Sequence, residues 1–459
     1  MHVRADQRGH HGLASEINPR TNLNNQAWSL PVVFDGTTAS LRWTENLGAD
    51  WQLLAQAMSQ QLRTDDRIAF PFGCGAEGNY DRYCSDGSFD LYDYRSEGER
   101  RDTLSGAITL TGQALLGGMT HQLSTGLGWT DFRMGSNTQV YNFAGVGQID
   151  GSVQVGPNTD SPYPTAARHE RSAELHLRDR IDLGPDTRLW LGVRHTRLSR
   201  SSDDSASYDQ SFTTPWVALS QQLTDATLVY GSWGQGVETE VTPNLPMYAN
   251  ANRPLPALKS EQVELGLKIN QADWAAGVTL FDIRRPTTED IGTCDGSDGS
   301  CTRRIDGNAR HRGIEANAEA RWNDWTLQAS AQWLRARREG ATDATMNGLT
   351  PTNVAQRSAR VLATWQVPSF AGLGLQASVS HEGSRYVLPD DSARIPGWTT
   401  MGLASRYATR AFGHDCLLRL GVDNLFDRRA WKESPYEFSH VYLYPLEPRT
   451  YRASLQVTL

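Results

Sequence analysis

The chain has 459 residues, of which 38% are hydrophobic and 21% charged, with a formal net charge of −8 at pH 7. This charge gives no basic surface for nucleic acid, so we expect no nucleic-acid partner. No apolar run reaches the roughly 18 residues that a transmembrane helix needs, so the sequence predicts none.

The first 36 residues carry no strand pattern. Their opening, MHVRADQRGHHGLASEIN, has no apolar core and no small-residue cleavage site, so we expect no secretory signal peptide. Two explanations stay open at this point: a cytosolic protein, or a start codon within a longer gene.

From residue 37 onward, apolar and polar residues alternate in long stretches. In DWTLQASAQWLRARR (324–338), Trp325 and Trp333 bound an apolar face, and amides and hydroxyls fill the other face. Alternation with a period of two is typical of β-strands with one apolar and one polar face. It predicts 17 strands, at 37–47, 50–62, 101–114, 119–133, 168–182, 186–200, 211–222, 225–236, 258–270, 273–286, 310–322, 324–339, 354–367, 372–386, 397–410, 414–427 and 447–459.

The links between these strands are very short at one end and long at the other. Links of one or two residues include Gly48-Ala49 and Gln271-Ala272, whereas the long links are 63–100, 134–167, 237–257, 287–309, 340–353 and 428–446. This arrangement is typical of a transmembrane antiparallel β-barrel with short periplasmic turns and long extracellular loops. A soluble sandwich or propeller would also alternate, but its strands are usually only about five or six residues long.

Tryptophans are placed as a membrane barrel would need them. Trp325 and Trp333 are eight residues apart, which is roughly 27 Å along a strand and roughly 19 Å of height at a tilt of about 45°. An apolar band of about 25 Å is flanked by aromatic girdles in such barrels. The opposite face carries charges that a dry core could not hold without partners, so it indicates a wet bore or one packed against a polar plug; these residues are Glu174, Arg178, Arg194, Glu264, Lys268, Glu315, Glu319, Arg321, Arg360, Arg406, Arg419 and Arg452.

Four of the five cysteines form two close pairs in polar loop segments. Cys74 and Cys84 bound CGAEGNYDRYC, and Cys294 and Cys301 bound CDGSDGSC. Such spacing favours local disulfides in an oxidising compartment. A metal site is the alternative, but no histidine accompanies either pair at zinc spacing, so we expect no metal. The fifth, Cys416, is expected to be an apolar residue on a strand.

An odd number of strands cannot close into a bacterial barrel. The first and last of 17 strands would run in the same direction, whereas these barrels have even numbers and close antiparallel. Open edges would leave backbone groups unpaired in lipid, at several kcal/mol each. We therefore expect an odd number of strands upstream of Met1, with residues 1–36 as the remnant of an extracellular loop and residues 37–459 as an incomplete barrel.

Four segments resemble TonB-dependent outer-membrane receptors of the siderophore class, and the resemblance spans nearly the whole chain. They are RLGVDNLFDRRAW (419–431), YPLEPRTYRASLQVTL (444–459), VYGSWGQGVE (229–238) and LKSEQVELGLK (258–268). The resemblance implies a barrel of about 22 strands, which leaves about five strands missing. It also implies a place in the outer membrane of a Gram-negative bacterium, in contact with its lipids, and a ferric siderophore as the transported ligand.

The chain also differs from that family. A signal peptide, a TonB box and a plug domain are expected in an intact relative, whose partner is the TonB complex, and none is recognised here. Without a plug domain, we do not expect this chain to engage TonB or to carry out energy-coupled uptake. The final residue, Leu459, stands where an aromatic residue is frequent, and the NLFD residues Asn424 to Asp427 are interpreted as a structural signature near the outer rim.

By this resemblance, loop aromatics would bind the siderophore. Aromatic rings supply stacking surfaces and phenol hydroxyls supply hydrogen bonds to a chelate; the candidates are Tyr80, Tyr83, Tyr92, Tyr94, Trp431, Tyr436 and Tyr442. The same rings would also serve to order long loops or to sit in the aromatic girdle. No G-x-S-x-G, H-E-x-x-H or phosphate-loop motif is present, so we expect no catalytic residues, no enzyme activity and no cofactor.

Three other functions stay open on the sequence. A receptor of the same family for cobalamin, a sugar or another nutrient would have the same signatures. An unplugged diffusion pore would have the same polar bore. A soluble β-rich enzyme or lectin would share the alternation, although no group of residues supports catalysis.

Overall fold

The computed structural model describes residues 18–78, 82–243, 247–251, 253–294, 299–411, 413–437 and 440–458. Nineteen strands form a single antiparallel sheet. In the described ranges, helical structure is confined to two single 3₁₀ turns, η1 (Gly75–Glu77) and η2 (Ala344–Met346). None of the helices described is long and apolar enough to cross a membrane.

Seventeen of the nineteen strands follow one another in chain order, each paired with the next, and the other two branch from β3. This confirms the predicted number of long strands and the all-β antiparallel architecture. The long strands are β1 (Leu30–Asn46), β2 (Trp51–Pro71), β3 (Ser88–Leu116), β4 (Met119–Met134), β7 (Arg168–Asp182), β8 (Thr187–Ser202), β9 (Ser205–Thr224), β10 (Thr227–Glu238), β11 (Leu258–Asn270), β12 (Trp274–Ile291), β13 (Thr302–Trp322), β14 (Trp325–Glu339), β15 (Arg357–Gln366), β16 (Leu373–Glu382), β19 (Trp398–Ala411), β20 (His414–Asp423) and β25 (Thr450–Thr458).

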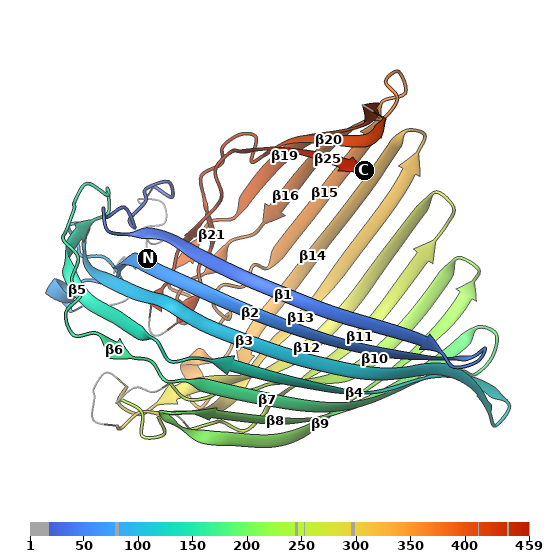
Figure 1. Cartoon of the computed structure of the whole chain (residues 1–459), viewed down its shortest axis with the longest axis horizontal. Helices are drawn as coiled ribbons and strands as arrows, with labels where there is room; N and C mark the ends of the chain where they lie inside the picture. Colours follow the sequence, from blue (N-terminus) through green and yellow to red (C-terminus); the bar gives the residue numbers. More distant parts are fainter. Residues whose placement is uncertain are drawn as a thin grey trace.

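The remaining strands lie at one end of the sheet, and all of them except β5 have only two or three residues. They are β5 (Thr138–Gln148), β6 (Tyr163–Pro164), β17 (Arg385–Tyr386), β18 (Arg394–Ile395), β21 (Trp431–Glu433), β22 (Tyr436–Glu437), β23 (His440–Val441) and β24 (Tyr444–Pro445). We call this end the loop end, and the opposite end, where tight connections such as Gly117-Gly118 join the long strands, the turn end. Figure 1 shows the loop end at the left and the turn end at the right.

The sheet curves into an incomplete barrel. Figure 1 shows the strands passing around a bore, from β1 on the near wall to β25 on the far wall. Within the described residues β1 pairs only with β2, and β25 pairs only with β20, so the sheet keeps two edges that do not join. Both edge strands run from the loop end to the turn end, which is the direction conflict that the strand count predicts.

The two faces of the sheet differ in chemistry. Apolar residues such as Leu265 (59% exposed), Leu455 (66% exposed) and Trp325 (45% exposed) lie on one face without covering partners. The other face holds the predicted charges and lines open concavities, one of about 650 Å³ beside Arg406, Arg419 and Arg452. Concavities on the polar face indicate that this face lines the bore and that the apolar face points to lipid.

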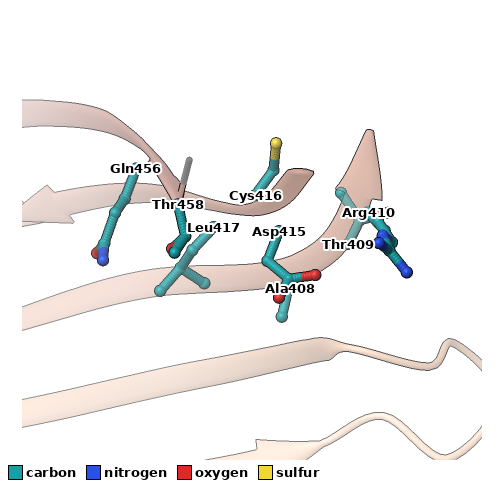
Figure 2. Close-up of a pocket in the computed structure, with 8 residues that line it drawn as sticks. All are labelled: Ala408, Thr409, Arg410, Asp415, Cys416, Leu417, Gln456 and Thr458. Atoms are coloured by element: carbon teal, nitrogen blue, oxygen red, sulfur yellow. The ribbon is translucent and has the colours of Figure 1, made fainter. Parts of the chain in front are cut away.

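Side chains at the turn end also alternate between the bore face and the apolar face of the sheet. In Figure 2, Asp415 and Leu417 of β20 and Gln456 of β25 point to one side and Cys416 points to the opposite side. This side chain is not in a disulfide, and it shares its face with the exposed Leu418 and Leu420. Cys416 therefore lies on the apolar face, as the strand pattern predicts.

Three predicted loops are wrong in extent. The segment 287–309 is shortened from both ends, because β12 continues to Ile291 and β13 begins at Thr302. The segment 63–100 is mostly strand, because β2 continues to Pro71 and β3 begins at Ser88. The segment 134–167 contains β5 and β6, and β1 begins seven residues before the predicted strand, at Leu30. In the extensions of β2 and β3, most side chains on both faces are half-buried or buried, so the alternation that marks membrane-spanning strands is lost. The extension of β1 is exposed on both faces.

A buried core holds the loop end together. It joins segments that are distant in sequence: the stretch before β1, the ends of β2 and β3, the β16–β19 connection and the last loop; its residues are Leu23, Ala69, Tyr83, Phe89, Leu91, Val387, Leu388, Ala393, Ile395, Trp431, Val441 and Leu443. We call this set the loop-end core. Arg20 adds a polar link, because its guanidinium donates to Leu446 O (2.8 Å) and pairs with Asp427 (2.8 Å).

The NLFD residues have a structural role at this end. Asn424 is buried, its side-chain amide donates to the carbonyls of Arg428 (3.0 Å) and Glu447 (2.9 Å), and its side-chain oxygen accepts from Arg428 N (2.8 Å). The backbone of Asn424 has φ of 47°, a left-handed conformation that asparagine tolerates better than most residues. The segment therefore turns the chain sharply out of β20 and fastens both ends of the last loop.

A second polar network connects the β10–β11 loop to the β12–β13 hairpin. Arg303 makes two hydrogen bonds of 2.8 Å to Asp290, and Tyr248 donates to the same carboxylate at 2.8 Å. The Arg303 guanidinium also lies 5.3 Å from the centre of the Tyr248 ring. Burial and the bond to Asp290 raise the pKa of Tyr248 to about 12, so the hydroxyl stays a donor. A disulfide between Cys294 and Cys301 closes the hairpin beside this network, in the pairing expected from the spacing.

Removing Arg303 should release this loop from the hairpin. In Arg303→Met, Asp290 loses a bidentate partner and Tyr248 loses its cation, which we expect to cost about 1.5 kcal/mol of local stability. Proteolysis within the β10–β11 loop should then accelerate. Arg304→Met is the matched control, because Arg304 donates only to Thr342 (3.2 Å) in the described structure; equal proteolysis of both variants would contradict the assigned role.

Candidate functional site

The site is built on an arm formed by the parts of β2 and β3 beyond the membrane band. A bulge starts the arm: between the pairs Thr64–Glu99 and Asp66–Ser96, β3 has one residue more than β2. Gly98 adopts φ of 76° there, and its N–H donates to the Asp65 carboxylate at 2.6 Å. Beyond the bulge β3 leaves β4 and pairs with β5 instead. The extra residue reverses which β3 side chains face the bore.

This shift brings aromatic side chains from three strands onto one face. Phe70 of β2 lies opposite Tyr92 of β3, and Tyr92 and Tyr94 lie opposite Phe143 and Tyr141 of β5. With two neighbours they form what we call the aromatic cluster, which consists of Phe70, Phe72, Tyr92, Tyr94, Tyr141, Phe143 and Tyr442.

The rings of the aromatic cluster contact one another closely. Tyr92 and Tyr141 are stacked, with ring centres 4.8 Å apart and planes 17° apart. Phe72 meets the Tyr92 ring edge-on at 5.5 Å, and Phe70 lies 6.1 Å from Tyr442, which the last loop contributes. Offset and edge-on contacts at these distances are favourable beyond the apolar area they bury. The cluster thus forms a pre-arranged aromatic surface.

The aromatic cluster faces the same side as the bore wall. Phe70 is an even number of residues from Gln60 on β2, and residues separated in this way lie on the same face of a strand. The bulges beside β2 insert their extra residues into β1 and β3, so the alternation of β2 itself is unbroken and Phe70 stays on the polar face. The opposite face of the arm, with Ala69 and Leu91, packs into the loop-end core. The cluster is therefore presented at the mouth of the bore on a rigid, two-sided support.

A disulfide fastens the tip of the arm. Cys74 and Cys84 are bonded across the β2–β3 connection, in the pairing expected from their spacing, and both are buried. The Glu77 carboxylate lies close to both sulfurs. Because the sulfurs are joined to each other, they offer no thiolate to a metal, and we assign this group a structural role.

Phenol hydroxyls give the aromatic cluster hydrogen-bonding capacity. Burial raises the pKa of Tyr141 and that of Tyr94 above the ordinary tyrosine value. Both hydroxyls are therefore protonated at neutral pH and able to donate. Tyr94 accepts from Gln139 at 3.4 Å, whereas the Tyr141 hydroxyl bonds to no residue that the structure describes. The arrangement can stack on a flat or apolar ligand surface while donating to its oxygen atoms.

Comparison with known proteins decides the family. The family described as TonB dependent receptor-like, beta-barrel, matches residues 4–425. The chain belongs to the TonB-dependent receptor family. Members of this family are outer-membrane receptors and transporters rather than enzymes, in agreement with the prediction of no enzyme activity.

Relatives and solved structures of TonB-dependent receptors resemble the chain over most of its length. The ferrichrome receptor FcuA of Yersinia enterocolitica is 25% identical over 377 residues, which cover 78% of this chain and 48% of that protein. The ferric preacinetobactin receptor BauA of Acinetobacter baumannii has a TM-score of 0.77 at 20% identity, covering 92% of this chain and 63% of BauA. The ferric-catecholate import receptor Fiu of E. coli K12 has a TM-score of 0.72 at 14% identity, covering 95% of this chain and 65% of Fiu. The chain thus spans about half the length of FcuA.

The structure places the predicted ligand residues of this TonB-dependent receptor chain in two environments. Tyr92, Tyr94 and Tyr442 come together in the aromatic cluster. Tyr83 and Trp431, each 1% exposed, belong to the loop-end core, and Tyr436 packs against that core. Tyr80 lies outside the described residues. Ligand binding by any of these residues stays a prediction.

Four members of the aromatic cluster are missing from the sequence prediction. They are Phe70, Phe72, Tyr141 and Phe143, and they lie in segments that were interpreted as loops. The signal was present as alternation in AFPF (69–72) and VYNF (140–143). Such short alternating runs identify strands only when their partner strands are known.

Proposed function

We propose that this chain forms the barrel of an outer-membrane TonB-dependent receptor that binds ferric siderophores at the loop end and takes them through its bore. The observation that carries the proposal is the aromatic cluster, which presents stacked rings and phenol donors on the bore side of the mouth. Ferric siderophores combine oxygen-rich chelating groups with organic scaffolds, and such a surface matches both. The names of FcuA, BauA and Fiu, which are receptors for iron chelates, support the ligand class. In the whole protein, family membership makes TonB the expected source of energy.

Binding to the folded chain tests this function. The chain, refolded in detergent, is titrated with ferrichrome, with an iron-loaded catechol chelate and with cyanocobalamin, and quenching of its tryptophan fluorescence is followed. We expect at least one iron chelate to bind, and Tyr141→Leu to raise its dissociation constant about threefold to tenfold through loss of ring stacking. Tyr407→Leu is the control, because among the described aromatic rings Tyr407 contacts only Phe370 (5.4 Å), and it lies at the turn end.

Two results would overturn the proposal. Binding of cyanocobalamin without binding of any iron chelate would favour a receptor for another nutrient. Equal affinities of Tyr141→Leu and Tyr407→Leu would show that the aromatic cluster is not the binding surface. Either result leaves the barrel fold and the family unchanged.

A further inference from the structure

Arginines cross four neighbouring strands on the lipid-facing side of the barrel. They are Arg284 of β12, Arg312 of β13, Arg335 of β14 and Arg357 of β15, and we call them the arginine row. All four are exposed. Strand register places Arg312 directly opposite Arg335, and Trp333 directly opposite Arg357. On each strand the arginine has the same parity as the apolar residues, so the row faces away from the bore.

The arginine row lies at the boundary of the apolar band on the loop side. Two residues nearer the turn end than Arg312 and Arg335 are the exposed Ile314 and Trp333. Two residues are roughly 7 Å along a strand, so the guanidinium groups of Arg312 and Arg335 begin where the lipid-facing apolar surface ends. This is the level of lipid headgroups rather than of acyl chains.

Positive charge in this region exceeds the local negative charge. Asp282 pairs with Arg310 (2.6 Å) and with Arg312 (3.0 Å), and Glu339 adds a longer contact of 3.8 Å to Arg310. Arg284, Arg335 and Arg357 pair with no carboxylate among the described residues, even though Glu261 lies opposite Arg284 in the strand register. Like charges directly opposite on neighbouring strands are unfavourable. Asp282 offsets this repulsion on the Arg312 side only, so an anion beside Arg335 would reduce it further.

We propose that the arginine row binds the phosphate groups of lipids in the leaflet on the loop side. The planar guanidinium matches phosphate oxygens in a bidentate manner, which favours phosphate over other anions. The row faces lipid and not the bore, so the transported ligand and any occupant of the bore do not reach it. Lipid headgroups, in contrast, are present at this level at high local concentration.

Lipid retention tests the proposal with matched variants. The full chain is reconstituted into phosphatidylcholine vesicles with or without phosphatidic acid, extracted in mild detergent, and its bound lipid is measured by native mass spectrometry. Arg312→Gln/Arg335→Gln/Arg357→Gln removes three charges from the lipid side. Arg360→Gln/Arg406→Gln/Arg419→Gln removes three charges from the bore side of β15, β19 and β20. Strand content by circular dichroism checks that each variant folds.

The unaltered chain should retain phosphatidic acid in preference to phosphatidylcholine. The lipid-side triple variant should lose that retention by about fivefold or more, the factor expected for even one basic residue near an anionic surface, and the bore-side triple should not. If the lipid-side triple does not fold, Arg335→Gln alone should show about a fivefold loss. Equal loss in both triples, or undiminished retention in the lipid-side variant, would overturn the proposal. Displacement of the lipid by inorganic phosphate would instead assign the row to free phosphate.

Discussion

Replacing Ala329 with arginine should destabilise the barrel by about 2–4 kcal/mol, the cost of a basic side chain on the lipid face near the bilayer midplane. Ala329 of β14 lies midway between Trp325 and Trp333, both exposed on the apolar face. Its cross-strand neighbours are Ala318 and Val361, which offer a guanidinium no partner. The charge would therefore be held in the hydrocarbon layer or would distort the lipid around it.

The neighbouring residue supplies the control. Gln328 is on the polar face, where its amide donates to Glu319 at 2.9 Å. In Gln328→Arg the new guanidinium would lie beside that carboxylate and water in the bore, so we expect a change within about 0.5 kcal/mol. Adjacent positions on one strand thus receive the same substitution in opposite environments.

Urea unfolding in lipid vesicles, followed by tryptophan fluorescence, measures both variants. The unfolding midpoint of Ala329→Arg should fall well below that of the unaltered chain, and that of Gln328→Arg should stay close to it. Equal shifts would mean that the two faces of β14 meet the same medium. A large shift for Gln328→Arg alone would mean that the polar face of β14 points to lipid and the apolar face to the bore.

The barrel was predictable because one physical rule applies to every spanning strand. Lipid on one side and water on the other impose alternation on each strand, and no packing with another layer interferes. The same rule places tryptophans at the band edges: Trp325 of β14 stacks on Trp365 of β15 with ring centres 5.7 Å apart. The strand count and the faces of the charged residues follow from the sequence for this reason.

The arm was not predictable because its two faces are both covered. Ala69 and Leu91 pack into the loop-end core, while Phe70 and Tyr92 pack among other rings, so neither face is consistently polar. The bulge at Gly98 also changes the parity of β3 within a single strand. A glycine in the sequence does not by itself identify a bulge, because the chain contains 41 glycines in many roles.

The candidate site could be predicted only in part for a related reason. An aromatic residue in a polar loop has the same sequence context whether it is buried or displayed. Trp431 and Tyr442 are eleven residues apart, yet one is enclosed in the loop-end core and the other contacts Phe70 in the aromatic cluster. Which of these occurs depends on contacts with residues distant in sequence, such as Val387 in the β16–β19 connection and Leu23 near the start of the chain.

Removing the Cys74–Cys84 disulfide should loosen the arm and leave the barrel intact. A cross-link that closes a loop of about this length contributes about 3 kcal/mol, which corresponds to roughly two orders of magnitude in the equilibrium for local opening. In Cys74→Ala/Cys84→Ala, amides of the arm such as those of Phe70 and Tyr92 should exchange faster with deuterium. Alanine is the chosen replacement because both cysteines are buried and serine would leave an enclosed hydroxyl.

The effect should stay local because beyond the bulge β3 has left β4 and pairs with β5, and β2 keeps only the pair of Arg67 with Leu30 of β1. Exchange in β13 and β14 should be unchanged, and Cys416→Ala, at the turn end and outside any disulfide, should match the unaltered chain throughout. The aromatic cluster depends on the register of Phe70, Tyr92 and Tyr141, so iron-chelate binding should weaken together with the faster exchange. Faster exchange with unchanged iron-chelate binding would mean that the aromatic cluster does not bind the ligand. Unchanged exchange would mean that the loop-end core, with Leu91 and Val441 at its centre, holds the arm without the disulfide.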